Sequence, residues 1–75
     1  MIKDKISLMI ELVTTDVISA IMEETAVSVQ EAMRIFYNSE IFERLNDPQT
    51  ELYRESGGYI FYLYKNWHNI SELII

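Results

Sequence analysis

The sequence predicts an all-α fold, a small helical bundle of three to five helices with a helix-turn-helix-like corner. Three observations lead to this prediction. Apolar residues recur at helical spacing over most of the chain. Serines that can act as N-caps (Ser28, Ser39 and Ser56) precede three of these segments, and the proline and both glycines fall between them. The length of 75 residues allows a single helical domain, 1–75.

The first helix is expected from about residue 4 to residue 24, where apolar residues occupy two sides of the helix. Such a helix is either sandwiched in a core or shared with a second subunit. Thr14-Thr15-Asp16 can bend or split it, because β-branched residues and aspartate are weak helix formers.

We expect the central helix to begin after Ser28, which can form a capping box with Glu31. In this arrangement the Ser28 hydroxyl accepts the backbone amide of Glu31, and the Glu31 carboxylate accepts the backbone amide of Ser28. Asn38-Ser39 then provides a break and a second N-cap for a shorter helix. Asn46-Asp47-Pro48 ends that helix, since the residue before a proline avoids the helical region. The sequence of residues 50–54 is compatible with either a helical turn or an extended loop.

The last helix is expected from about residue 58 to residue 68, with Ser56 as its cap. The tail, residues 70–75, is too apolar to be an ordinary solvated end, and we expect it to dock on this chain or on another one. The apolar faces of the four segments predict a core made of Val13, Val17, Ile21, Met33, Phe36, Phe42, Leu45, Ile60, Leu63 and Trp67.

The chain is acidic, with a formal net charge of −6, and its six lysines and arginines are spread out. A nucleic-acid backbone or an anionic lipid surface needs several converging cations, so the charge argues against both. Asp4 and Glu11 interrupt the apolar N-terminal segment, so we expect no secretory signal there, and no apolar run reaches membrane-spanning length. These features predict a cytoplasmic protein with no membrane association.

Catalytic chemistry has little support in the sequence. His68 and Glu72 are one helical turn apart and provide two of the three or four ligands that a metal site needs. The chain has no cysteine, no glycine-rich phosphate loop and no nucleophile with a base at a recognisable spacing. We therefore expect no enzymatic activity, no catalytic or metal site and no cofactor.

The segment 21–37 resembles a helix-turn-helix, with Ala26-Val27-Ser28 as the turn and residues 29–37 as the recognition helix. It departs from that motif at Met22 and Ala26, where a small alanine and a turn glycine usually stand. Were the chain a DNA-binding regulator, Gln30, Arg34 and Asn38 would be the donors facing the DNA. The alternative is a structural corner with a capping box.

Residues 36–56, FYNSEIFERLNDPQTELYRES, also resemble short helical proteins of Gram-positive gut bacteria whose function is unknown. The resemblance is carried by Asn38-Ser39, Phe42, Leu45, Asp47, Thr50, Leu52-Tyr53 and Ser56. It implies a fold and no activity. From the residues themselves, we expect two caps, a turn and anchors that fold this loop back on the core.

The leading functional hypothesis is a non-catalytic protein–protein interaction module, homodimeric or bound to another protein, because more apolar residues are present than one small core needs. The candidate interface residues lie off the main helical faces: Leu8, Leu12, Ile18, Met22, Ile35, Phe61 and Tyr62. Irregular packing within one chain is the alternative explanation for them, and a helix-turn-helix DNA-binding regulator is the alternative function.

Overall fold

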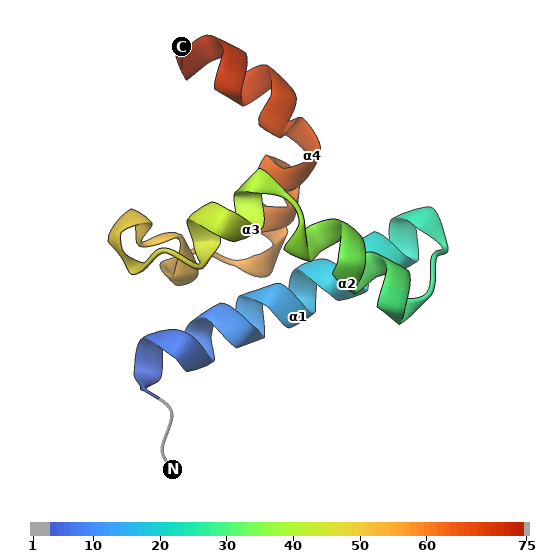
Figure 1. Ribbon diagram of the computed structural model, residues 1–75, viewed down its shortest axis with the longest axis horizontal. Helices are drawn as coiled ribbons and strands as arrows, with labels where there is room; N and C mark the ends of the chain where they lie inside the picture. The colour runs from blue at the N-terminus through green and yellow to red at the C-terminus, as the bar shows by residue number, and fades with distance from the viewer. Residues whose placement is uncertain (1–3, 75) are drawn as a thin grey trace.

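The computed structural model describes the backbone of residues 4–74 and the side chains of residues 4–67. Within residues 4–74 the chain forms helices and no strand, which confirms the predicted all-α bundle (Figure 1). The elements are α1 (Lys5–Thr25), α2 (Val29–Tyr37), α3 (Glu40–Leu45), the 3₁₀ turns η1 (Pro48–Thr50) and η2 (Leu52–Arg54), and α4 (Gly57–Ile74).

The three predicted serine caps are confirmed. The hydroxyls of Ser28, Ser39 and Ser56 each accept the backbone amide three residues further on, at 3.1–3.2 Å. The second half of the capping box is wrong, because the carboxylate of Glu31 binds Arg34 instead of reaching back to Ser28. Capping therefore explains where α2, α3 and α4 begin, as the sequence indicated.

Helix α1 is continuous through Thr14-Thr15-Asp16, so these residues neither split it nor end it. The hydroxyl of Thr15 donates to the carbonyl of Glu11 at 2.9 Å, a bond that satisfies the side chain inside its own helix. The helix ends at Thr25, and its C-cap, Ala26, has the left-handed conformation (φ 58°) that glycine usually supplies.

The segment between α3 and α4 consists of two 3₁₀ turns joined by Glu51, which also has a positive φ (56°). The hydroxyl of Thr50 donates to the carbonyls of Arg44 and Asp47 at 2.7 and 2.9 Å. Asp47 in turn accepts the amide of Gln49 at 3.0 Å. The ambiguous stretch 50–54 is thus largely helical, and side-chain hydrogen bonds hold the start of the loop against the end of α3.

Helix α4 packs against α1 through a very close contact at its first residue. A Cβ atom placed on Gly57 would lie 2.4 Å from the Cβ of Asp16, so only glycine fits there. Two turns later Lys65 forms an ion pair with Glu24 at 3.2 Å. Both contacts join residues 41 positions apart, and they connect the first half of α4 to the second half of α1.

Helix α4 is longer than predicted and runs to Ile74 rather than to about residue 68. Its last turns extend beyond the other helices in Figure 1. The expected docking of the apolar tail and the pairing of His68 with Glu72 depend on side chains that lie outside the described residues.

The core lies where α1, α2, α3 and α4 meet. Of the residues predicted to form it, nine are buried or partly buried, whereas Met33 is 37% exposed and the prediction for it is wrong. Four further residues complete the buried cluster: Ile10, Ile18, Ala32 and Ile41. Ala32 and Phe36 are the fully buried residues of α2, so they define its core-facing side, and Met33 falls on the flank of the helix.

Candidate functional site

Two of the predicted interface residues, Leu8 and Leu12, lie one helical turn apart on α1 and are 49% and 59% exposed. The buried residues of α1 lie on the opposite side of the helix. Packing among the described residues does not bury either leucine. They are the strongest of the residues that the sequence indicated for an interface.

The other predicted interface residues divide into three groups. Tyr62 is 55% exposed, as expected. Met22, Ile35 and Phe61 are partly buried. Ile18 is only 8% exposed and belongs to the core, so its assignment to an exposed surface is wrong.

Ile18 is buried because α1 is covered over a wider arc than one helical face. Helix α4 contacts α1 at Asp16 and Glu24, and α2 packs on α1 as well. A helix with neighbours on two sides buries residues that a single-face reading of its sequence places outside.

Phe61 is shielded by its own helix. The ammonium group of Lys65 lies 4.6 Å from the centre of the Phe61 ring, and the Tyr64 ring stacks on it at 6.2 Å. Lys65 also pairs with Glu24 of α1. These contacts give Phe61 a role in joining α4 to α1, which weakens its candidacy as an interface residue.

Sequence reasoning missed a second exposed apolar stripe, which we call the α2 stripe and define as Val29, Met33 and Tyr37. The three residues lie four apart along α2 and are 37–44% exposed. The Tyr37 ring meets the partly buried Phe42 ring edge-on at 4.9 Å, which extends the stripe toward α3. Their regular spacing was visible in the sequence, but Met33 was assigned to the core.

The residues proposed to face DNA are largely engaged within α2. Arg34 forms a two-bond ion pair with Glu31. The hydrogen bond from Arg34 lowers the pKa of the Glu31 carboxyl, and the same bond raises the pKa of Arg34. The side-chain amide of Asn38 donates to the carbonyl of Arg34 at 2.7 Å. Of the three donors, Gln30 is exposed with no recorded side-chain hydrogen bond.

The turn between α1 and α2 nevertheless has helix-turn-helix character. Ala26 is left-handed at the position where that motif usually has glycine, and its amide donates to the carbonyl of Met22 at 2.9 Å. Ser28 then caps α2. The corner is therefore built as the sequence predicted, with an alanine in a conformation that favours glycine.

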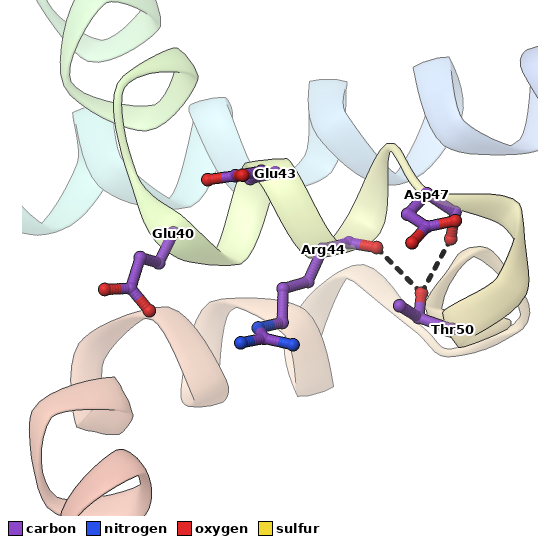
Figure 2. Close-up of a pocket in the computed structure, with 5 residues that line it drawn as sticks. All are labelled: Glu40, Glu43, Arg44, Asp47 and Thr50. Carbon is purple, nitrogen blue, oxygen red and sulfur yellow. Dashed lines mark hydrogen bonds between the residues drawn. The ribbon is translucent and has the colours of Figure 1, made fainter.

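A surface hollow of about 350 Å³ lies beside α3 and the loop that follows it. Its lining is Glu40, Glu43, Arg44, Asp47 and Thr50 (Figure 2). The Arg44 side chain reaches toward α4, where its guanidinium carbon lies 5.4 Å from the centre of the Trp67 ring. The indole of Trp67 donates to Glu40 at 2.6 Å. Glu40 and Arg44 thus hold Trp67 between them, which gives both side chains a structural role.

A second hollow of about 480 Å³ lies between the start of α1 and the end of α3. It is lined by Asp4, Lys5, Ile6, Ser7, Ile10, Asn46 and Pro48. Asp4 is the N-cap of α1 and accepts the amide of Ser7 at 2.8 Å, a bond that lowers the pKa of its carboxyl. This lining combines a cap with apolar contacts and offers no arrangement of catalytic groups.

Within the described residues, no three histidine, cysteine, aspartate or glutamate side chains gather in a way that could hold a metal ion. No helix in that part of the chain is both long enough and apolar enough to cross a membrane. No protein-family model, curated protein or solved structure with which we compared the chain matches it. The resemblance to short bacterial helical proteins therefore stays a prediction.

Proposed function

We propose that the protein is a small, non-catalytic protein–protein interaction module of the cytoplasm that forms a homodimer. The observation that carries this proposal is the exposure of two apolar surfaces at regular helical spacing: Leu8 with Leu12 on α1, and the α2 stripe. Single exposed apolar residues are ordinary in a monomer. Rows of them on one helical face are typical of surfaces that bind another protein.

The size of the chain strengthens this proposal. A 75-residue domain buries only about 60–65% of the surface that its unfolded chain exposes, and association is a common way for such a domain to gain stability. Full burial of a leucine side chain contributes about 1.5–3 kcal/mol. In a two-fold dimer, each of Leu8 and Leu12 would contribute twice.

DNA binding is the alternative function, and the left-handed turn at Ala26 favours it. Two observations oppose it. The net charge is −6, and the guanidinium of Arg34 is already paired with Glu31, so a phosphate backbone would meet few free cations on α2. The face that this reading assigns to DNA also lies next to the apolar α2 stripe.

Sedimentation velocity between about 1 and 200 μM tests the proposal, because a micromolar dissociation constant falls in that range. We expect the wild-type chain to be a dimer at the upper concentrations. Leu12→Glu should shift it to a folded monomer by placing a charge in the contact. Gln49→Glu adds the same charge at an exposed residue of η1 that belongs to neither apolar surface, and it should leave the dimer intact.

A wild-type monomer at 200 μM, with Leu12→Glu and Met33→Glu both harmless, would contradict the proposal. Retention of duplex DNA at physiological salt, lost in Arg34→Ala and weakening steeply as salt increases, would favour the alternative function instead.

A further inference from the structure

The outer face of α1 has the pattern of a helix-pairing seam. We use this name, the outer face, for six exposed residues of α1: Lys5, Leu8, Leu12, Thr15, Ser19 and Glu23. From Lys5 to Ser19 they alternate spacings of three and four, which keeps them on one stripe of a helix, as the contact positions of a coiled coil are. Figure 1 shows α1 forming one long edge of the molecule.

The order of large and small side chains along this face favours an antiparallel pairing of two copies. In one antiparallel register, Leu8 of one copy faces Ser19 of the other, and Leu12 faces Thr15. Each of these facing pairs then combines one leucine with one small residue, and side chains of unequal size interdigitate well. A parallel pairing would stack leucine on leucine at one end and serine on serine at the other.

The polar side chains of the face are compatible with this contact. The hydroxyl of Thr15 already donates to the carbonyl of Glu11. Thr15 therefore needs no hydrogen-bond partner from another chain, and its methyl group is free to pack on a leucine.

Charge selects the same orientation. Lys5 and Glu23 lie at opposite ends of the outer face, about five helical turns apart. No ion pair of either residue is recorded within the described residues. An antiparallel pair brings each Lys5 beside the Glu23 of the other copy, whereas a parallel pair opposes like charges at both ends. Such rim charges determine orientation more than affinity.

We infer that two copies of this chain associate through the outer face of α1, with the two α1 helices antiparallel and Leu12 against Thr15 at the centre. This inference rests on the proposed homodimer and names its contact surface. The occupant of the face is a second copy because the face is complementary to itself in both shape and charge.

Charge reversal tests the inference, with the dissociation constant measured by sedimentation equilibrium. Lys5→Glu and Glu23→Lys should each weaken the dimer about tenfold, since one substitution makes two symmetry-related pairs repulsive. Combining both substitutions in one chain restores the two attractive pairs and should return the constant to nearly the wild-type value. Because both residues are exposed, circular dichroism should show folded chains throughout.

Disulfide trapping tests the orientation directly, because the chain contains no cysteine. An oxidised mixture of Leu8→Cys and Ser19→Cys chains should yield mainly the mixed disulfide. Gln49→Cys, exposed on η1, is the control that should not cross-link efficiently with either chain. Preferential Leu8→Cys self-pairing would indicate a parallel contact and overturn the inference.

The failure of this inference can be distinguished from failure of the proposed homodimer. A wild-type dimer whose constant is unchanged by Lys5→Glu, Glu23→Lys and Leu12→Glu would contradict the α1 contact while leaving the dimer in place. A wild-type monomer at every concentration would contradict both.

Discussion

Replacing Gly57 with alanine should destabilise the fold, although the same change at the adjacent Gly58 should stabilise it. Replacing glycine with alanine restricts the unfolded chain, which stabilises the fold by about 0.4–1 kcal/mol where the native backbone suits both residues. At Gly58 nothing lies within 3.9 Å of an added Cβ, and the φ angle is not positive. We therefore expect Gly58→Ala to stabilise the chain by about 0.5–1 kcal/mol.

At Gly57 an added Cβ would lie 2.4 Å from the Cβ of Asp16, so α4 must move away from α1. Overpacking of this kind costs about 1–3 kcal/mol. After the gain from replacing glycine is subtracted, Gly57→Ala should have a net destabilising effect of up to about 2 kcal/mol. Urea unfolding followed by circular dichroism, at one protein concentration, measures both changes. Equal effects at the two glycines would refute the close contact.

A second substitution identifies the atoms responsible. Asp16→Gly removes the clashing Cβ, so it should offset most of the cost of Gly57→Ala in the double variant. Asp16→Ala retains that Cβ and should give little relief. If Asp16→Ala rescued the fold as well as Asp16→Gly did, the carboxylate rather than the Cβ would be the source of the conflict.

Three further predictions concern Ala26, Thr14 and the pair of carboxylates on Asp4 and Glu31. Ala26→Gly should stabilise the chain by about 1 kcal/mol, because a left-handed alanine is strained; an unchanged urea midpoint would contradict this. Thr14→Val should stabilise by about 1 kcal/mol, since the Thr14 hydroxyl is buried without a hydrogen-bond partner; a lowered melting temperature would indicate a hidden partner. The pKa values of Asp4 and Glu31 are lowered in the fold, so their stabilisation is present at neutral pH and is lost as the pH falls below about 4. A carboxyl-carbon NMR titration should place both below their ordinary values, with Glu31 returning to its ordinary value in Arg34→Ala.

The sequence was sufficient to predict the helices and their beginnings because local chemistry determines both. Ser28, Ser39 and Ser56 each cap a helix through one short-range hydrogen bond. The break at Asn46 follows from the proline two residues later. The length of α4 was underestimated because the polar residues near His68 resemble a helix end. None of these residues prevents a helix from continuing.

The surface was harder to predict because exposure depends on how helices cross. Ile18 is buried since α1 has neighbours on two sides, and Met33 is exposed since no described residue covers one flank of α2. The contact of Gly57 with Asp16 joins residues far apart in the sequence, so no local sequence pattern predicts it. Leu8 and Leu12 were assigned to the surface correctly because they lie opposite the buried face of a regular helix.

The most direct test of the account is an isotope-filtered NOE experiment on a mixture of ¹³C-labelled and unlabelled chains. The filter is needed because Leu12 and Thr15 are also neighbours within one helix. At concentrations where sedimentation gives a dimer, we expect intermolecular contacts between the methyl groups of Leu12 and Thr15. In Leu12→Glu, which retains the methyl groups of Leu8, the intermolecular contacts of Leu8 should be lost. Intermolecular contacts confined to the α2 stripe, or none at all, would contradict an α1-mediated dimer.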